Sequence, residues 1–263
     1  MGQDLEEPPR RLMLSVADWH RRFEQQAGWT DLLRQQLFSQ LNLSPRSTIL
    51  EVGCGTGAIT RRLHNLSPAP LIGVDVDFPR LQYATKQDAA TQFAAADGLC
   101  LPFAPAAFDL TVCHFYLLWV SDPLQAIGEM ARVTRPGGTV ALLAEPDYGS
   151  RIDSPSKLAR IGQLQTHALQ TQGADPFIGR QLPGLLQRAG LSAIQSGSLS
   201  RQSDSVFDPA AFELEWQVIE SDLAGELPPS ELASLKSLDR DAFQQGTRVL
   251  YVPTFYAWGT VPA

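Results

Sequence analysis

The sequence predicts an α/β fold with a mostly parallel β-sheet covered by helices on both faces. Short apolar segments alternate with helical segments between residues 48 and 144, and this alternation is typical of parallel strands joined by crossover helices. A glycine-rich turn joins the first strand to the helix that follows it, which is a common connection in such sheets. The chain has 263 residues, 44% of them hydrophobic, and contains no obvious linker. We therefore expect residues 1–263 to form a single domain.

Strand segments alternate with helical segments between residues 48 and 144. The helix over 77–89 has the clearest boundary, because Asp77 can cap it and Pro79 stands in its first turn. The run Pro136-Gly137-Gly138 is expected to end the last helix of this region, since proline and consecutive glycines break helical structure. The predicted strands cover 48–52, 71–75, 93–96, 108–114 and 139–144, and the helices between them cover 58–66, 77–89 and 123–134.

Helical segments dominate on either side of this alternating stretch. Trp19, Phe23 and Ala27 recur at helical spacing, so residues 12–43 are expected to be helical. The chain divides into N-terminal helices (1–43), a core (44–148) and two helical insertions (149–178 and 208–246). After residue 146 we predict helices at 154–172, 179–189, 209–224 and 229–245, and strands at 191–199 and 248–258.

The glycine-rich turn has the spacing GxGxG. Gly53 and Gly55 permit a tight turn and let a ligand approach the backbone, and Gly57 lets the helix start close to the strand. Dinucleotide sites use GxGxxG, in which backbone N–H groups bind a pyrophosphate. Here Glu51 precedes the turn, which favours a ligand with an ammonium group. An ordinary carboxylate at a strand end is the alternative interpretation of Glu51.

Two further aspartates follow the next two strands. Asp75 stands 20 residues beyond Gly55, where an acid accepts hydrogen bonds from ribose hydroxyls in sheets that bind adenosine. A plain turn aspartate is the alternative, and it describes Asp77 better. Asp97, followed by Gly98, could accept from an adenine amino group, or could simply start a loop. The three acids together predict an adenosine-containing ligand at this edge of the sheet.

The order of these motifs resembles class I S-adenosylmethionine (SAM)-dependent methyltransferases, in the UbiE-like and type 11 small-molecule group. The similar stretches lie in residues 48–145 and read ILEVGCGTG, GVDVD, AADGLCLPF, FDLTVCHFYLLWVSDP and ARVTRPGGTVALLAEP. The resemblance implies a Rossmann-like sheet of seven strands in the order 3-2-1-4-5-7-6, with the last strand antiparallel. It also implies that SAM lies across the carboxyl ends of the first strands and that residues 44–148 bind it.

The resemblance assigns cofactor contacts residue by residue. It places Glu51, Gly53 and Gly55 at the methionine end, Asp75 at the ribose and Asp97 at the adenine. The stretch after the fourth strand departs from the pattern, because Trp119 stands where this group often has a histidine, so no role is carried over from that histidine. The expected cofactor-binding residues are Glu51, Gly53, Cys54, Gly55, Gly57, Asp75, Val76, Asp97, Gly98 and His114.

Methyl transfer from a sulfonium is an in-line displacement that requires mainly alignment and the exclusion of water. A general base is needed only when the nucleophile is a protonated hydroxyl or a carbon acid. His114, Glu145 and Asp147 are the candidate bases, because they follow the fourth and fifth strands at the edge where such sheets bind ligands. Packing at the strand end is the alternative for His114, whereas His167 is assigned to an exposed helical face.

We expect the chain to methylate a small molecule at an oxygen, nitrogen or carbon atom, with S-adenosylhomocysteine (SAH) as the product. The helices in 149–178 and 208–246 should cap the acceptor, but no motif in them identifies it. Two other functions are weighed against this one. The GxGxG spacing disfavours an NAD(P)-dependent reductase, and the intact contact positions disfavour a non-catalytic SAM-binding or scaffold protein.

Charge and cysteine content narrow the expected partners. The formal net charge is −7, which disfavours binding to nucleic-acid phosphates. Cys54, Cys100 and Cys113 lack metal-ligand spacing, so we expect no metal and reduced thiols in the cytoplasm. No stretch approaches the roughly 20 apolar residues of a membrane span, and the N-terminus lacks the apolar run of a signal peptide. A monomer or homodimer that acts on a small-molecule substrate, away from nucleic acid and membranes, is expected.

Overall fold

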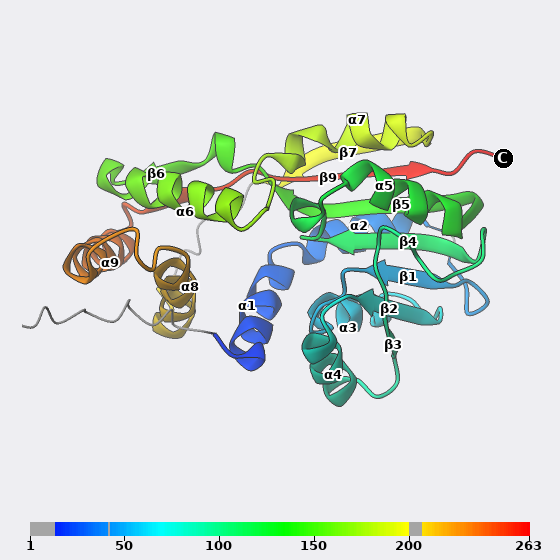
Figure 1. Cartoon of the computed structure of the whole chain (residues 1–263), viewed down its shortest axis with the longest axis horizontal. Helices are drawn as coiled ribbons and strands as arrows, with labels where there is room; N and C mark the ends of the chain where they lie inside the picture. Colours follow the sequence, from blue (N-terminus) through cyan, green and yellow to red (C-terminus); the bar gives the residue numbers. More distant parts are fainter. Residues whose placement is uncertain (1–13, 42, 200–206) are drawn as a thin grey trace, which may run out of the picture.

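The computed structural model describes residues 14–41, 43–199 and 207–263. The described strands form a seven-stranded sheet in which the first five run parallel and β9 pairs antiparallel with both of its neighbours (Figure 1). The predicted mostly parallel α/β sheet with an antiparallel last strand is therefore confirmed. In spatial order the strands are β3 (Gln92–Ala95), β2 (Leu71–Asp75), β1 (Ile49–Val52), β4 (Phe108–His114), β5 (Thr134–Pro146), β9 (Thr254–Thr260) and β7 (Ser192–Leu199).

The helices lie where the sequence predicts them. Asp77 caps its helix, because its Oδ1 atom accepts a hydrogen bond from the Arg80 N–H at 3.0 Å. The predicted start of the N-terminal helical stretch at residue 12 lies outside the described residues. The helices are α1 (Val16–Gly28), α2 (Asp31–Gln40), α3 (Ala58–His64), α4 (Phe78–Gln87), α5 (Pro123–Val133), α6 (Ala159–Thr171), α7 (Leu182–Arg188), α8 (Pro209–Asp222) and α9 (Pro229–Gln244), with short 3-10 turns η1 (Leu117–Trp119), η2 (Tyr148–Ser150), η3 (Ser156–Leu158) and η4 (Ile178–Gln181).

Each face of the sheet packs against its own set of helices. One core cluster joins Leu50 and Val52 of β1 to α5 and α7, and the other joins Ile49 to α2 and α3. Successive side chains of a strand point to opposite faces, so Glu51 shares the face of Ile49. By the same alternation His114 shares the face of Val112, which belongs to the α2–α3 cluster. Both polar residues therefore point toward the N-terminal helices.

Three boundaries differ from the prediction. The helix predicted from residue 154 begins only at Ala159, after η3, and two strand boundaries also differ. β5 begins at Thr134, five residues early, and includes the Pro-Gly-Gly run, where its pairing with β4 is shifted in register. The predicted strand at 248–258 is two strands, β8 (Val249–Tyr251) and β9, separated at Pro253. Proline lacks the N–H needed to continue a ladder. β8 instead pairs with β6 (Ile152–Ser154) in a small sheet that the sequence did not predict.

The inserted helices form a layer at one end of the sheet (Figure 1). α6, α8 and α9 pack around a separate apolar cluster that includes Phe212 and Trp216. Behind this cluster Asp239 accepts a hydrogen bond from the Trp216 indole at 2.8 Å and one from Arg248 Nε at 2.7 Å. The insertions therefore have a core of their own beside the strand ends. None of the described helices is long and apolar enough to cross a membrane.

Candidate active site

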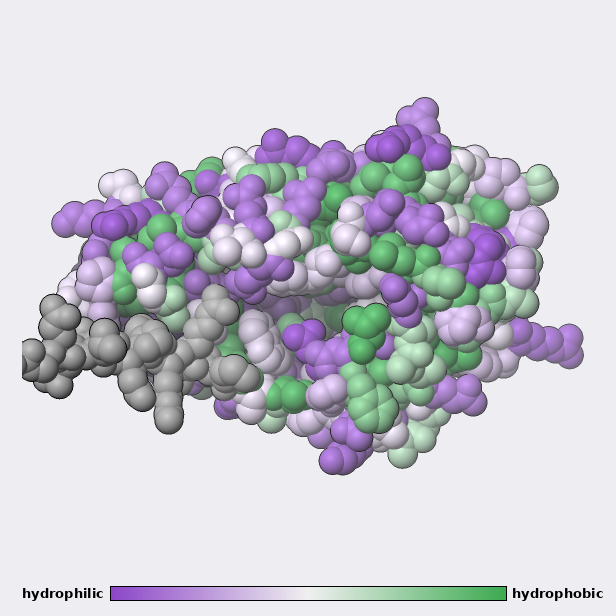
Figure 2. Space-filling view, viewed as in Figure 1, coloured by the Kyte–Doolittle hydropathy of each residue, from purple (hydrophilic) through white to green (hydrophobic). Residues whose placement is uncertain are grey.

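A cavity of about 750 Å³ opens at the carboxyl ends of β1 to β4. The strand ends form one side of it, and residues of α1, α6 and α8 form the other. The face of the molecule is hollowed there, with polar and apolar side chains around the mouth (Figure 2). A cavity between a glycine-rich sheet edge and inserted helices can hold an extended ligand beside a second molecule.

Most of the predicted cofactor residues line this cavity. Gly57 is not among the residues that line it. Its φ of +78° begins α3, and a Cβ at Gly57 would lie 3.2 Å from the Ala84 Cβ and 3.3 Å from the Phe93 ring. Gly57 therefore serves the packing of α3 against neighbouring elements. The predicted residues that do line the cavity are Glu51, Gly53, Cys54, Gly55, Asp75, Val76, Asp97, Gly98 and His114.

Glu51 places an unsatisfied carboxylate oxygen at the base of the cavity. The residue is 1% exposed, and its Oε2 atom has no hydrogen-bond partner among the described residues. Burial raises the pKa of Glu51 to about 7, while the nearby Thr60 and the Arg34 guanidinium oppose this shift. An unpaired polar atom in a buried site is unfavourable. The position is therefore suited to a ligand group that is cationic or donates a hydrogen bond.

Asp75 holds the glycine turn in place. Its Oδ2 atom accepts from the Gly55 N–H at 2.7 Å, and its Oδ1 atom accepts from the Asp77 N–H at 2.9 Å. Gly53 and Gly55 both have positive φ, at +75° and +52°, a conformation that side chains disfavour. Because each carboxylate oxygen can accept more than one bond, Asp75 can also receive ligand hydroxyls from the cavity.

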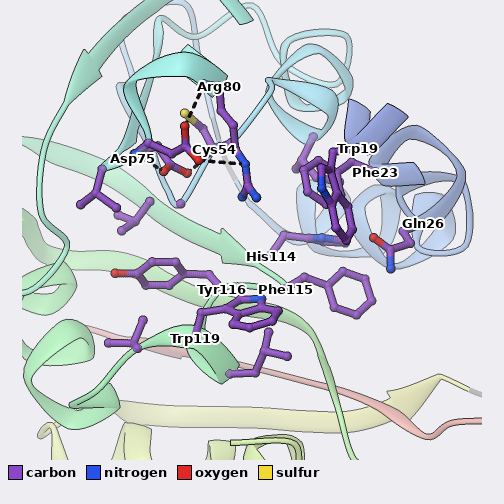
Figure 3. Close-up of a pocket in the computed structure, with 18 of the residues that line it drawn as sticks. Trp19, Phe23, Gln26, Cys54, Asp75, Arg80, His114, Phe115, Tyr116 and Trp119 are labelled. Carbon is purple, nitrogen blue, oxygen red and sulfur yellow. Dashed lines mark hydrogen bonds and ion pairs between the residues drawn. The ribbon is translucent and has the colours of Figure 1, made fainter. Parts of the chain in front are cut away.

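Tyr116 forms the side of the cavity opposite Asp75 (Figure 3). A Cβ at Gly53 would come within 2.3 Å of the Tyr116 ring, and one at Gly98 within 2.0 Å of its hydroxyl. The ring thus lies directly on the two glycines. Beside it, Asp97 accepts the Leu99 N–H at 2.9 Å, so it does start a loop while also lining the cavity.

His114 is buried at the end of β4 and is held from behind by the N-terminal helices. Its Nε2 atom lies 2.8 Å from the Thr30 hydroxyl and 3.4 Å from Arg34 Nη1. Burial lowers the pKa of His114 well below its usual value, and the Arg34 cation adds to this effect. The imidazole is therefore neutral at physiological pH, and a proton transferred to it would meet the neighbouring guanidinium.

Arg34 is a buried charged residue beside the site that no sequence motif singles out. It is fully buried, and its charge acts on both Glu51 and His114. The feature of the sequence that could have drawn attention to Arg34 is its position in α2, four residues before Phe38 on the apolar face of the helix. A charged residue on such a face is unusual unless it is paired, and Arg34 does pair with Asp31 at 2.5 Å.

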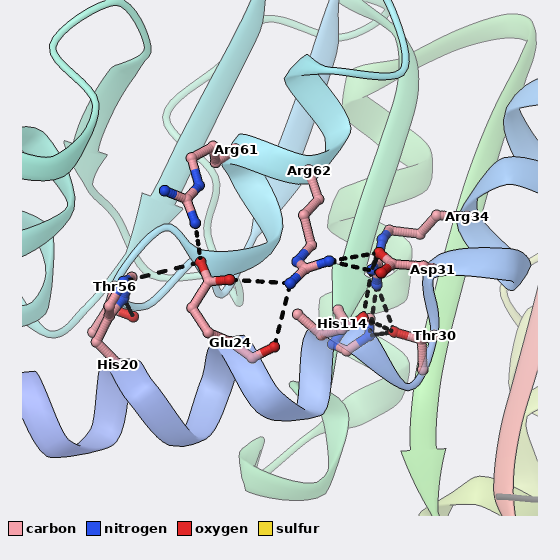
Figure 4. Close-up of polar contacts among 10 residues, drawn as sticks. His20, Glu24, Thr30, Asp31, Arg34, Thr56, Arg61, Arg62 and His114 are labelled. Carbon is pink, nitrogen blue, oxygen red and sulfur yellow. Dashed lines mark hydrogen bonds and ion pairs between the residues drawn. The ribbon is translucent and has the colours of Figure 1, made fainter. Parts of the chain in front are cut away.

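A polar network attaches the N-terminal helices to the site (Figure 4). His20 of α1 contacts Thr56 of the glycine turn at 2.9 Å. Two arginines of α3 bind acids of α1 and α2. Arg61 lies 2.9 Å from Glu24, and Arg62 lies 3.1 Å from Glu24 and 2.7 Å from Asp31. α1 is thereby held across the cavity, where its Trp19 and Phe23 form part of the wall. The sequence pattern indicates only a helical repeat for these two aromatic residues.

Glu145 and Asp147, two of the predicted candidate bases, are not among the residues that line the cavity. Glu145 is fully buried and accepts hydrogen bonds from backbone N–H groups of the loop after β4. Asp147 is 2% exposed and binds Arg180 with both oxygens, at 2.6 and 2.7 Å. The strand order placed both at the correct edge, but their side chains point into the protein.

The far part of the cavity, beyond the strand ends, is bounded by α6 and α8. Gln165 and Asp222 lie in its wall. A chain of polar contacts orients them: Gln165 Nε2 donates to Asp222 at 3.2 Å, and Arg151 donates to Gln165 Oε1 at 2.8 Å. Arg151 in turn pairs with Asp153 at 2.8 Å. His167, on the same helix, is exposed, as predicted.

The described residues contain no group of three or more histidine, cysteine or acidic side chains placed to hold a metal ion. The cavity nevertheless combines features suited to an organic ligand. A carboxylate without a partner lies at one end, hydroxyl-accepting acids lie along the strand ends, and aromatic rings line both sides. Such a site can bind and align two molecules without a metal.

Residues 50–142 match the family described as a methyltransferase domain. The chain is 35% identical over 124 residues to malonyl-[acyl-carrier protein] O-methyltransferase of Pseudescherichia vulneris, a match covering 47% of each chain. It is 31% identical over 170 residues to O-methyltransferase cnsE of Penicillium expansum, covering 62% of this chain and 59% of the relative. The chain thus spans between about half and three fifths of the length of these relatives.

Solved structures share the fold. The YcgJ protein of Bacillus subtilis superposes with a TM-score of 0.58 at 17% identity, covering 88% of this chain and 98% of that one. A Haloferax volcanii methyltransferase, solved in complex with a methyltransferase activator, gives a TM-score of 0.62 at 16% identity and covers 94% and 96% of the two chains. The sheet order implied by the sequence resemblance is that of the structure.

Proposed function

Residues 50–142 match a methyltransferase domain, and from this premise we propose that the chain transfers a methyl group from SAM to a small-molecule acceptor and releases SAH. The cavity at the strand ends is the proposed site for both molecules. Bound SAM supplies an activated methyl group on its sulfonium. The chain's own residues bind the cofactor, align the acceptor and exclude water.

The observation that carries this proposal is the unpartnered Glu51 oxygen. The methionine end of SAM presents an ammonium group, and Glu51 Oε2 is a buried acceptor without a described partner, next to the glycine turn. An ionised acceptor paired with an ionised donor forms a strong hydrogen bond. A pyrophosphate at this place would meet a carboxylate. The fit therefore favours SAM over a dinucleotide.

The remaining cofactor contacts follow the strand ends. We assign the ribose hydroxyls to Asp75 and the adenine amino group to Asp97, with Val76 and Gly98 beside the rings. Tyr116 supports the cofactor from the opposite side of the cavity. Gly53 and Gly55 let the backbone approach the ligand, since neither has a Cβ.

The chain supplies alignment and a shielded site more than acid–base chemistry. Glu145 and Asp147 already bind protein groups, and His114 lies against Arg34, which disfavours its protonated form. Asp222 is the carboxylate in the far wall, and we propose that it accepts a hydrogen bond from the acceptor. Positioned reactants alone can account for a large part of a rate enhancement.

The acceptor is proposed to lie between α1, α6 and α8, where aromatic and amide side chains alternate. Trp19, Phe23 and Trp119 give apolar surface, whereas Gln26 and Gln165 offer hydrogen bonds. Relatives are named as O-methyltransferases and as demethylmenaquinone methyltransferases. We propose an acceptor that is partly apolar and carries hydrogen-bonding groups.

We place the protein in the cytoplasm, as a monomer or homodimer without a nucleic-acid partner. The cysteines at positions 54, 100 and 113 are all free, which suits a reducing compartment. The net charge of −7 disfavours contact with a phosphate backbone. Size-exclusion chromatography with light scattering measures the oligomeric state directly.

Calorimetric titration with SAM and SAH tests the proposed cofactor. We expect one site per chain in the wild type and a large loss of affinity in Gly55→Val. The Gly55 φ of +52° disfavours a side chain, and the new atoms would lie against Phe23 and Asp75. Gly128→Ala is a matched control, because its Cβ meets nothing within 4 Å. Unchanged affinity in Gly55→Val would show that the turn is not the binding site.

A further inference from the structure

The loop after β4 carries aromatic side chains into both parts of the cavity. Tyr116 lies on Gly53 and Gly98, in the cofactor part. Trp119 is 51% exposed and also lines the cavity. Figure 3 shows both rings on the side of the cavity opposite Asp75. The backbone of residues 115–119 therefore decides how much room the cofactor and the acceptor have.

One carboxylate outside the cavity holds this backbone. Glu145 Oε1 accepts hydrogen bonds from the N–H groups of Tyr116 and Leu117, both at 2.9 Å, and Oε2 accepts from the Leu118 N–H at 3.3 Å. Successive N–H groups that converge in this way form an anion-binding nest. Here the anion is a side chain of the same protein, at the end of the neighbouring strand.

The backbone on both sides of this contact is in an uncommon conformation. Phe115 has a φ of +49°, and Ala144 has a φ of +61°, which few residues other than glycine adopt. Such conformations persist only when surrounding contacts hold them. The pairing of β5 with β9 also shifts between Leu142 and Glu145. The chain bends at the points that bring the carboxylate to the loop.

We propose that Glu145 is a positioning residue of the active site: its carboxylate holds the backbone of residues 116–118 so that Tyr116 and Trp119 form the walls that fit SAM and the acceptor. This inference rests on the proposed function, because it assigns those ligands to the cavity. Glu145 does not touch the cavity, so it acts through the loop. Both of its oxygens are engaged.

The titratable groups that face Glu145 stay neutral near pH 7, so the ionisation of Glu145 can be followed apart from theirs. Burial raises the pKa of Glu145 to about 7, although the three backbone N–H groups oppose this shift. The titratable groups that face it are the Cys113 thiol and the Tyr116 phenol, and burial raises the pKa of each, so both are neutral near pH 7. Asp147, two residues further along the chain, forms an ion pair with Arg180.

Amide NMR spectra of the full chain test the contact without any ligand. In the wild type, the N–H signals of Tyr116 and Leu117 are expected to move with pH between 6 and 8 as Glu145 ionises. In Glu145→Gln the movement should disappear. Glu129→Gln is the matched control, because Glu129 also accepts a loop N–H, that of Leu101 at 2.8 Å, away from the cavity. In Glu129→Gln, the N–H signals of Tyr116 and Leu117 should still move with pH.

SAH affinity then tests the positioning role. A glutamine at position 145 turns an N–H donor toward the Leu118 N–H, so the loop should shift and SAH should bind about tenfold more weakly. Glu129→Gln should bind within twofold of the wild type. The proposal is overturned by Tyr116 and Leu117 amide signals that are the same in the wild type and in a folded Glu145→Gln, or by SAH affinity in that variant that equals the wild type. Absence of SAH binding by the wild type would refute the proposed function, whereas the amide titration would still decide whether Glu145 holds the loop.

Discussion

SAH affinity is expected to rise with pH because of Glu51. Its buried carboxyl has a pKa of about 7 in the free protein, so the group is mostly protonated at pH 6. The ammonium of the ligand pairs with the ionised form, and binding must therefore release the proton. The raised pKa means that the free protein holds a proton which the complex expels, so affinity increases as pH rises through 7.

The size of the effect follows from the ionised fraction of Glu51. A group with a pKa of about 7 is about one tenth ionised at pH 6 and about three quarters ionised at pH 7.5. SAH should therefore bind roughly eightfold more tightly at pH 7.5 than at pH 6, because only the ionised fraction is competent. The comparison stops at pH 7.5, where Glu51 is mostly ionised.

Titration calorimetry in two buffers with different ionisation enthalpies measures both affinity and proton release. Close to one proton should be released at pH 6, and about a quarter of one at pH 7.5. Glu51→Gln should lose most of the pH dependence, and at pH 7.5 it should bind about 1.5–3 kcal/mol more weakly, the range for a hydrogen bond to a charged group. Asp241→Asn, an exposed change on α9, should behave as the wild type. A flat wild-type profile without proton release, or an undiminished slope in Glu51→Gln, would refute this account of Glu51.

Three other outcomes are expected. Asp75→Ala should weaken SAH binding by about 1.5–3 kcal/mol, whereas Asp77→Ala should mainly lower the unfolding free energy by about 1 kcal/mol through loss of the α4 cap. Calorimetry measures the SAH affinity of each variant, and thermal melts measure its stability. If Asp77→Ala lost affinity and Asp75→Ala lost only stability, the two assigned roles would have to be exchanged. With an identified acceptor, His114→Ala should lower kcat less than about tenfold, because the neighbouring cation disfavours a base there; a loss of about 10²–10⁴-fold would make His114 the base. Hydrogen exchange should slow in α6 and α8 when SAH and an acceptor analogue bind, since these helices wall the cavity; identical exchange with and without ligands would argue against closure.

Local patterns in the sequence predicted most of the fold. The glycine turn, the cap at Asp77 and the apolar strands depend on residues close together in the chain. For example, Asp77 binds an N–H three residues away. Such interactions operate wherever the segment folds. The order of these segments then predicted a parallel sheet, and with it the edge at which Glu51 and Asp75 lie.

Sequence position alone did not predict where the Glu145 and Asp147 side chains point. Glu145 and Asp147 follow the fifth strand at the ligand edge, yet their carboxylates bind backbone and Arg180 instead of facing the cavity. The bend at Ala144 changes which way the next side chains point. A strand pattern with a period of two cannot anticipate such a bend, because the loop that receives Glu145 lies about 28 residues earlier in the chain.

The sequence by itself determined the fold class, the element order and the strand ends that form the proposed cofactor site, because these follow from local conformational preferences and from burial periodicity. Only the tertiary structure decided which distant groups meet. Thr30 reaches His114 across 84 residues of sequence, and Arg34 is buried where its charge acts on both Glu51 and His114. The Arg34 contacts modify the pKa shifts that burial causes in Glu51 and His114. They arise from packing α2 against one face of the sheet, a long-range arrangement that no local pattern of residues encodes.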